Sequence, residues 1–210
     1  MKLMLVGASG LVGQQVLRQA LAHPAVDSLI APTRKPLAAA SGLENPIIDF
    51  ERLPADAPWW QVDAVICTLG TTLSQAGSQA AFRRVDHDYP LAVAKLARAA
   101  GAGAFVLNSA LGAAAGSRVF YNRVKGEVEN AIAALGYPSL TLVRPSLLDG
   151  GPRPDSRPGE RAGLVVARMF RPLIPARYRA VATDAVARTL LAAALARVPG
   201  LHCIESEQIV

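Results

Sequence analysis

A tyrosine and a lysine lie four residues apart in a segment with helical spacing. On a helix, Tyr121 and Lys125 share one face, so that a phenol and an ammonium can converge on one point. The ammonium favours the ionised phenol, which lets a tyrosine exchange a proton with a carbonyl or an alcohol near neutral pH. Ser109 stands at the expected end of a strand, where its hydroxyl could hold the substrate oxygen. The three residues predict proton transfer. The alternative for Tyr121 and Lys125 is an ordinary surface pair.

A second group of residues predicts a phosphate-binding turn. Gly7, Gly10 and Gly13 lie between an apolar strand and a helical pattern, in the sequence GASGLVG. The first glycine permits a tight turn, the second lets the backbone approach a pyrophosphate, and the third lets the helix pack on the strand. We expect Gly7, Ser9, Gly10, Leu11, Val12 and Gly13 to bind a dinucleotide. The alternative is a turn that binds no ligand, since the spacing differs by one residue from the GxGxxG pattern.

The residues after the second expected strand indicate which dinucleotide is bound. An acidic residue that accepts hydrogen bonds from the 2′-hydroxyl of NAD is expected there, but the chain reads Thr33, Arg34 and Lys35. Two cations complement the charge of a 2′-phosphate, and arginine can bind it through two hydrogen bonds. The sequence therefore predicts NADP(H) as the preferred cofactor, with NAD(H) as the alternative. Arg34 and Lys35 could also be solvated loop residues.

These residues fit a chain in which strands and helices alternate. The pattern predicts an α/β protein with a doubly wound parallel sheet, the three-layer α/β/α Rossmann fold, with a small extension on the substrate side near the C-terminus. Ligands then bind beyond the carboxyl ends of the strands. Pro90 should kink or split the second helix. The expected strands are 2–6, 27–31, 46–50, 62–68, 104–107, 140–143 and 202–205. The expected helices are 11–22, 78–100, 117–135, 160–170 and 183–197, the last with Thr183 and Asp184 as its cap.

Length and composition restrict the class of protein. The 210 residues, of which 51% are hydrophobic and 18% charged, predict one folded domain over 1–210, with 145–180 as a lid over the site. No apolar run reaches the ~18 residues that a membrane helix needs, and the N-terminal run is too short for a secretory signal, so we expect a cytoplasmic protein. Two scattered cysteines and three histidines predict neither a metal site nor a disulfide.

The positive charge is concentrated in one segment. Of the net charge of +6, residues 151–180 contribute +5, from seven arginines against two acidic residues. This segment could cover an anionic substrate, bind a partner, bind nucleic acid or be a solvated surface. Nucleic acid is the least expected of these, because only Phe170 and Tyr178 supply aromatic rings.

Several blocks of the chain resemble the atypical short-chain dehydrogenase/reductases of the NAD-dependent epimerase/dehydratase superfamily, in particular the Tat-interacting-protein-like oxidoreductases and their bacterial relatives. The resemblance implies that Ser109, Tyr121 and Lys125 are catalytic, with the last two also touching the cofactor. It further implies that Thr68, Leu69 and Gly70 pass the adenine ribose, that Asp49 and Phe50 lie beside adenine, and that Pro145 and Ser146 lie beside nicotinamide. The resembling blocks are 7–13 (GASGLVG), 67–72 (CTLGTT), 81–86 (AFRRVD), 121–129 (YNRVKGEVE) and 143–146 (VRPS).

The chain departs from the family pattern in two ways. Ala110 follows Ser109 where a second serine is common, and the chain is too short for the large substrate domain of the sugar-nucleotide epimerases. We therefore expect an NADPH-dependent oxidoreductase that acts on a small carbonyl or alcohol. The alternatives are an NADP(H)-binding redox sensor without significant turnover and a flavin reductase, in which the Tyr121 and Lys125 pair would have no evident use. The long helices could pair in a homodimer.

Overall fold

The computed structural model describes residues 1–149 and 175–209. Seven parallel strands form the central sheet in the order β3-β2-β1-β4-β5-β6-β9. The order reverses between β1 and β4, the point at which ligands bind in open α/β sheets. The strands are β1 (Lys2–Val6), β2 (Ser28–Ile30), β3 (Leu43–Glu44), β4 (Ala64–Cys67), β5 (Ala104–Asn108), β6 (Ser139–Arg144) and β9 (Gly200–Glu205), and two short strands pair apart from this sheet, β7 (Leu148–Asp149) with β8 (Val181–Ala182).

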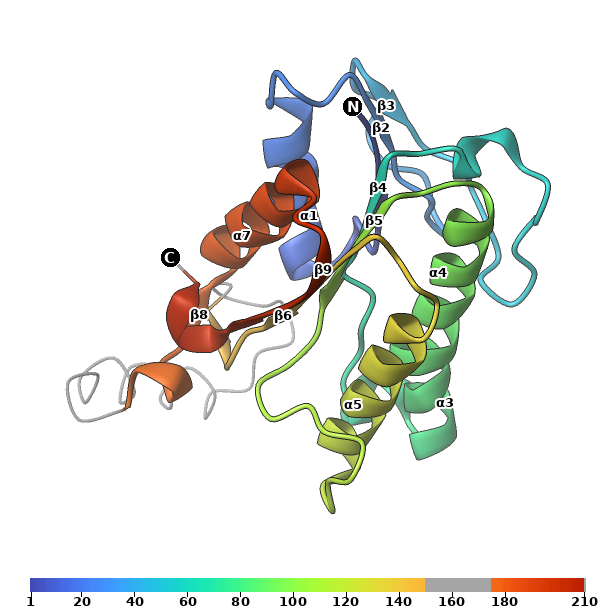
Figure 1. Ribbon diagram of the computed structural model, residues 1–210. Coiled ribbons are helices and arrows are strands. Elements are labelled where there is room, and N and C mark those ends of the chain that lie inside the picture. Colours follow the sequence, from blue (N-terminus) through green and yellow to red (C-terminus); the bar gives the residue numbers. More distant parts are fainter. Residues whose placement is uncertain (150–174, 210) are drawn as a thin grey trace.

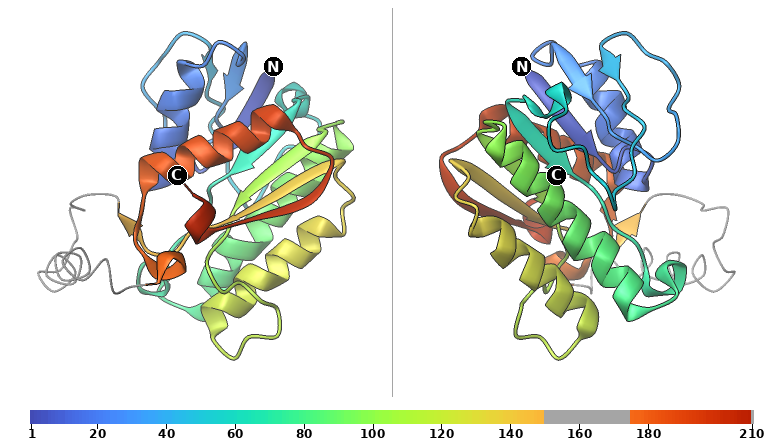
Figure 2. Two further views of the ribbon diagram at one scale, coloured as in Figure 1. Left: turned by 60° about the vertical axis from the view of Figure 1, so that its left-hand side comes forward. Right: turned by 90° about the vertical axis from the view of Figure 1, so that its right-hand side faces the viewer.

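Helices cover both faces of the sheet. On one face lie α1 (Leu11–Leu21) and α7 (Thr183–Ala196), and on the other lie α3 (Gln79–Arg83), α4 (Tyr89–Ala99) and α5 (Phe120–Ala133), as Figures 1 and 2 show. The central strand β1 is buried on both sides from Leu3 onward, which explains its apolar run from Leu3 to Val6. Leu3 and Leu5 belong to the core under α1 and α7, whereas Met4 and Val6 belong to the core under α4 and α5. The three-layer Rossmann fold expected from the sequence is confirmed.

The third expected strand was placed wrongly. Residues 46–50 do not form a strand: the third strand is β3, three residues earlier, and Ile47 makes only an isolated bridge to Thr33. Pro46 has no N–H to donate to a neighbouring strand. The Asn45 side chain takes its place, because its amide donates to the Ala31 carbonyl at 2.6 Å and to Thr33 Oγ1 at 2.8 Å. The side-chain hydrogen bonds of Asn45 thus end the pairing of β3 with β2 just before the range 46–50, where the sequence predicts a strand.

The long helix expected over 78–100 is divided before Pro90. Between α3 and α4 lies a π-helical turn, η2 (Arg84–Asp88), and Pro90 stands in the first turn of α4. Proline lacks an N–H and its ring crowds the carbonyl four residues earlier, and the wider π-turn accommodates both effects. The extra residue in this turn changes which side chains face the sheet.

Other boundaries differ by a few residues. The helix α5 begins at Phe120 rather than at 117, after Ser117 Oγ accepts the N–H of Val119 at 3.1 Å. The N-cap of α7 is Ala182, so Thr183 and Asp184 are not its cap. Asp184 instead binds α1, through Arg18 at 2.9 Å and Gln19 at 2.8 Å. The expected helix 160–170 and most of the expected lid and arginine-rich segment lie outside the described residues.

Within the described ranges, no helix is both long and apolar enough to cross a membrane. The same ranges hold no group of three or more histidine, cysteine, aspartate or glutamate residues that could bind a metal. The remaining short elements are the helix α2 (Leu73–Ala76) and the 3-10 turns η1 (Pro58–Trp60), η4 (Ala176–Tyr178) and η5 (Ser206–Gln208).

Candidate cofactor and catalytic site

The glycine turn after β1 is held by close backbone contacts. Gly7 has φ of +92°, and a Cβ there would lie 2.6 Å from Oγ1 of Thr68, which directly follows the neighbouring strand β4. A Cβ on Gly13 would lie 2.0 Å from the Gly7 carbonyl oxygen. Only glycine fits at these two positions. A Cβ on Gly10 would approach the Gly7 carbonyl oxygen no closer than 3.4 Å, so Gly10 leaves open space above the turn.

The N-terminus of α1 offers unpaired N–H groups beside this turn. Its N-cap is Gly10, without a side-chain cap and without an acidic residue in the first turn. Because helical hydrogen bonding starts with Gln14 N–H to the Gly10 carbonyl at 2.9 Å, the three preceding N–H groups lack a partner within the helix. Such a helix end attracts an anion. Val12 is buried in the core, and neither Leu11 nor Val12 lines the cavity.

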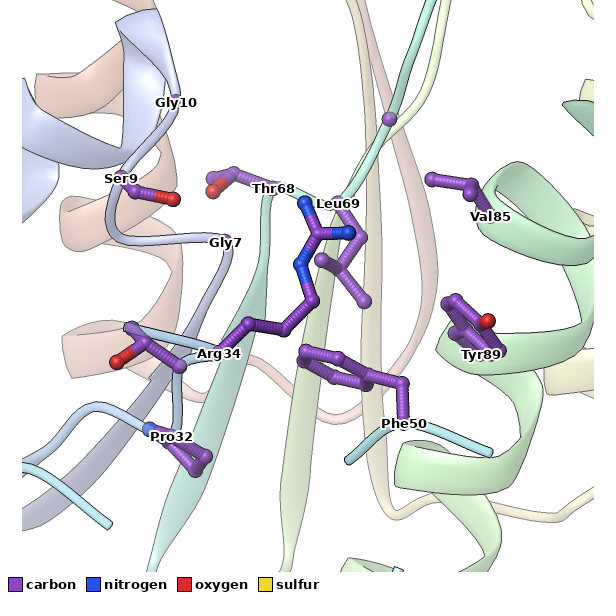
Figure 3. A pocket seen from close by; sticks show the side chains of 12 residues that line it. Gly7, Ser9, Gly10, Pro32, Arg34, Phe50, Thr68, Leu69, Val85 and Tyr89 are labelled. Carbon is purple, nitrogen blue, oxygen red and sulfur yellow. The ribbon is translucent and has the colours of Figure 1, made fainter. Parts of the chain in front are cut away.

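A cavity of about 130 Å³ lies above the turn, at the carboxyl ends of β1, β2 and β4. Figure 3 shows the glycine turn on one side and an aromatic wall on the other, with the Arg34 side chain extending between them. The cavity brings together nine of the residues expected to bind the cofactor. They are Gly7, Ser9, Gly10, Thr33, Arg34, Phe50, Thr68, Leu69 and Gly70, and they are joined by Pro32, Val85 and Tyr89, which were not expected.

Thr33, Arg34 and Lys35, in the loop that follows β2, are placed differently. Arg34 is exposed and lines the cavity, whereas Lys35 is exposed and does not line it. Thr33 is buried, and its hydroxyl donates to the Lys35 carbonyl at 2.7 Å while accepting from the Asn45 amide at 2.8 Å. Thr33 therefore shapes the turn that presents Arg34 to the cavity.

The aromatic wall consists of Phe50 and Tyr89, whose rings stack with centroids 5.3 Å apart. The Tyr89 hydroxyl donates to Glu51 Oε1 at 2.5 Å. Partial burial, and then this carboxylate, raise the pKa of Tyr89 to about 12. Asp49, expected beside adenine, is exposed and does not line the cavity; its Oδ1 accepts the N–H of Glu51 at 3.0 Å and orders the loop. Tyr89 and Val85 could have been found from their helical spacing with Phe82.

Ser109 and Tyr121, two of the residues expected to be catalytic, do not line this cavity. Ser109 directly follows β5 and is 5% exposed, and its Oγ is one of the few buried side-chain atoms that have no hydrogen-bond partner among the described residues. A hydroxyl that is buried without a partner costs stability, and a bound ligand could satisfy it. The Tyr121 ring is half-buried and lies 5.5 Å, centroid to centroid, from the ring of Phe82.

Lys125 is buried and forms an ion pair that the sequence did not predict. Its Nζ lies 2.8 Å from Oδ1 of Asp86, a carboxylate on η2. Burial lowers the pKa of Lys125, whereas Asp86 and then Tyr121 raise it. The net result is a raised pKa of Lys125. A Cβ on Gly70 would lie 3.3 Å from Asp86 Oδ1 and 3.7 Å from Lys125 Nζ. The cavity above the glycine turn and the buried Lys125 thus approach each other at Gly70.

The loop after β6 carries Pro145 and Ser146, which do not line the cavity. The Pro145 carbonyl accepts the N–H of Leu111 at 2.9 Å. The Ser146 hydroxyl donates to the Arg179 carbonyl, and its N–H donates to Ser206 Oγ at 3.1 Å. The first bond holds the loop beside the segment that follows Ser109, and the other two hold it against Arg179 and Ser206.

The comparisons with known proteins place the chain in a family. No family model matches it. It is 36% identical over 176 residues to the mitochondrial protein fmp52 of Emericella nidulans, covering 79% of this chain and 72% of that one. It is 38% identical over 161 residues to the protein HTATIP2 of Rattus norvegicus, covering 74% of this chain and 66% of that one. The chain belongs to the fmp52 family, and its similarity to HTATIP2 agrees with the Tat-interacting-protein-like resemblance seen in its sequence.

Solved structures share the fold. An oxidoreductase of the short-chain dehydrogenase/reductase family from Burkholderia thailandensis superposes with a TM-score of 0.67 at 21% identity, covering 99% of this chain and 92% of that one. Other structures of this fold are sugar-nucleotide epimerases solved with NAD. At such low identity the likeness concerns the fold alone.

The expectation of a cytoplasmic protein is contradicted. Several fmp52 relatives carry the word mitochondrial in their names, among them those of Emericella nidulans and Aspergillus clavatus. Composition and a short apolar N-terminal run report on membrane insertion and secretion, and neither identifies the compartment in which a protein of this family resides.

Proposed function

We propose that this protein is an NADPH-dependent oxidoreductase that transfers a hydride between nicotinamide and a small carbonyl or alcohol substrate. The observation that carries the proposal is the junction at Gly70, where the cavity above the glycine turn reaches the buried Lys125. A dinucleotide that fills the cavity from the glycine turn is thereby led toward the helix that carries Tyr121 and Lys125.

The residues present fit a dinucleotide. Gly7 and Gly13 leave no room for a side chain, Gly10 leaves open space, and the N-terminus of α1 has free N–H groups for a pyrophosphate. The stacked Phe50 and Tyr89 rings provide an apolar surface for a base. These features support a nicotinamide dinucleotide, such as the NAD found in solved structures of the same fold.

Arg34 supports the choice of NADP(H) over NAD(H). It lines the cavity beside the glycine turn, at the end of β2, where a ribose 2′-substituent is read in dinucleotide-binding folds. Its guanidinium can bind a phosphate through two charged hydrogen bonds but cannot accept one from a hydroxyl. Among the described residues that line this cavity none is acidic, so nothing in this wall repels a 2′-phosphate.

Three side chains share the proposed catalytic roles. When bound, nicotinamide supplies or accepts the hydride. Ser109, whose buried hydroxyl has no partner among the described residues, holds the substrate oxygen. Tyr121 gives the proton to this oxygen or takes it away, and Lys125, held in its charged form by Asp86, stabilises the phenolate that remains. Lys125 also donates to the cofactor ribose.

The test is calorimetric titration of the pure protein with NADPH and with NADH, for the native chain, Arg34→Ala and Lys35→Ala. We expect the native chain to prefer NADPH, and Arg34→Ala to lose about tenfold or more in affinity for NADPH while its affinity for NADH is unchanged. Lys35→Ala is the matched control, because Lys35 is a neighbouring exposed cation that does not line the cavity.

Two results contradict the proposal. If neither dinucleotide binds, the glycine turn is structural or holds another ligand, and the oxidoreductase function falls with it. If NADPH binds but Arg34→Ala and Lys35→Ala weaken it equally, the preference arises from general positive charge rather than from a contact with Arg34.

A further inference from the structure

The buried ion pair between Asp86 and Lys125 is unusual in its degree of burial. The carboxylate side chain is 1% exposed and the lysine side chain 6% exposed. Removing two charges from water costs free energy that only a close partner offsets, so each of these side chains requires the other. By contrast, three other ion pairs each have at least one partner that is far more exposed; they are Arg18 with Asp184, Arg83 with Glu127, and Arg144 with Glu129.

Asp86 has a second contact, in the loop that follows β4 and contains Gly70 and Thr71, which we call the cofactor loop. Its Oδ2 accepts the N–H of Thr71 at 2.8 Å, while its Oδ1 lies 2.8 Å from Lys125 Nζ. One carboxylate therefore touches both the loop that follows β4 and the helix α5. Gly70 lies between the two contacts with little space to move, because a Cβ at this position would meet Asp86 Oδ1 at 3.3 Å.

The π-helical turn η2 is what places Asp86 there. The residues on either side of this turn, Phe82 and Val93, are buried apolar core residues, and Asp86 shares their inward side as the buried charged residue of the turn. A charged residue at an inward position is costly and needs a purpose in the structure. The π-turn is the kind of irregularity that often accompanies functional sites.

The charges around Lys125 come from three elements. Asp86 faces it from η2, Tyr121 from its own helix, and the buried Cys67 from the end of β4. Burial raises the pKa of Cys67 to about 12, so this thiol is neutral at physiological pH. Of these three groups, Asp86 is the one that forms an ion pair with Lys125, at 2.8 Å from its Nζ.

We propose that Asp86 is a positioning residue that joins the cofactor loop to the catalytic lysine. Its carboxylate keeps Lys125 charged and directed toward Gly70, and it fixes the Thr71 amide so that the wall of the cavity and the helix carrying Tyr121 stay in register. This role rests on the proposed function, because it gives Lys125 its place beside the dinucleotide.

The first test is a double-mutant cycle of thermal stability with Asp86→Asn, Lys125→Met and the double variant, measured between pH 7 and pH 10. Asp86→Asn leaves an ammonium buried without a counter-charge, so we expect its melting temperature at pH 7 to fall by about 10 °C. The double variant removes both charges and should recover most of this loss. Asp88→Asn is the control, because Asp88 lies in the same π-turn but is more than half exposed.

The pH dependence separates an ion pair from simple packing. In the native chain the pKa of Lys125 lies above its ordinary value of 10.5, so its contribution to stability is fully present between pH 7 and pH 10. In Asp86→Asn, the largest influence that opposes burial is removed, so the pKa of Lys125 falls and the penalty diminishes as the ammonium loses its proton. The gap in melting temperature between the two proteins should therefore narrow from pH 7 to pH 10. A constant gap, or a double variant no more stable than Asp86→Asn, overturns the proposal.

The second test measures the join to the cofactor loop. We expect Asp86→Ala to accelerate amide hydrogen exchange at Thr71 and to lower the affinity for NADPH by about tenfold, while Asp88→Ala changes neither. Unchanged exchange at Thr71 in Asp86→Ala would show that the carboxylate does not hold the loop. If the native chain binds no NADPH, the proposed function fails, but the stability cycle and the exchange measurement still decide whether Asp86 joins the two elements.

Discussion

The two ends of the site are held in place by different means. At the phosphate end, Gly7 and Gly13 are fixed by backbone that approaches backbone, with no side chain between them. At the end that we propose to be catalytic, Lys125 is fixed by the carboxylate of Asp86, and Ser109 keeps a buried hydroxyl without a partner among the described residues. The phosphate end tolerates few substitutions, because any side chain at Gly7 or Gly13 would clash with backbone. The other end is built from side chains whose charges and hydrogen bonds would set their reactivity.

The largest effect is expected at the phosphate end, from Gly13→Ala, which tests whether backbone contact alone holds that end. The new methyl group would lie 2.0 Å from the Gly7 carbonyl oxygen, so α1 must separate from β1. We expect a loss of about 3 kcal/mol or more in the free energy of unfolding, measured by urea denaturation, and loss of dinucleotide binding. Gly10→Ala is the control in the same turn, since its methyl group would stay 3.4 Å from that oxygen. Equal stability of the two variants would contradict the steric account of the turn.

At the catalytic end, Tyr121→Phe should separate catalysis from binding. The substitution removes the phenolic proton and keeps the ring against Phe82, so the fold and the affinity for NADPH should change little. Turnover of a carbonyl substrate should fall by about a hundredfold or more. Tyr137→Phe is the control: Tyr137 is buried away from the cavity, and its hydroxyl donates to the Ala94 carbonyl at 2.6 Å. A Tyr121→Phe protein that retains its activity, or a native protein that binds NADPH without turnover of any carbonyl tested, favours a redox sensor.

The smallest effect on stability is expected for Ser109→Ala. Because its Oγ has no hydrogen-bond partner within the described chain, the substitution removes a buried group that is not satisfied. We expect the free energy of unfolding to stay the same or to rise by up to about 1 kcal/mol, while turnover falls. Thermal denaturation with a turnover assay checks both. A marked loss of stability would mean that Ser109 has a structural partner and is not held in reserve for a substrate.

The phosphate end was largely predictable from the sequence. Glycine has few other uses at a turn between an apolar strand and a helix, so Gly7, Gly10 and Gly13 defined the turn and the Rossmann fold together. The alternation of apolar and helical segments likewise predicted the sheet and its two helical layers, because parallel strands buried on both faces leave a continuous apolar pattern.

The catalytic end was predictable only in part. The spacing of Tyr121 and Lys125 predicted a shared helix face, but the buried partner Asp86 comes from another element, which the π-turn brings inward. Its inward spacing with Phe82 was the available indication. The third strand was misplaced because Asn45 competes with the backbone for hydrogen bonds, a choice that depends on the distant Ala31 carbonyl. Residues 150–174, which carry most of the arginine-rich segment, are outside the described chain.

The contact between Gly7 and Thr68 also has a consequence for the order of folding. β1 lies in the middle of the sheet and pairs with β4, from Leu3 opposite Ala64 to Val6 opposite Cys67. The whole segment between the two strands must therefore be synthesised, and must cross over the sheet, before the strands can pair. Pairings between such distant residues form late and slowly. During synthesis, the residues of the glycine turn are made early, but the turn packs against Thr68 only after β4 has been made. The nascent chain should therefore become able to bind a dinucleotide in a single late step, after β4 has docked, rather than by gradual growth of the site.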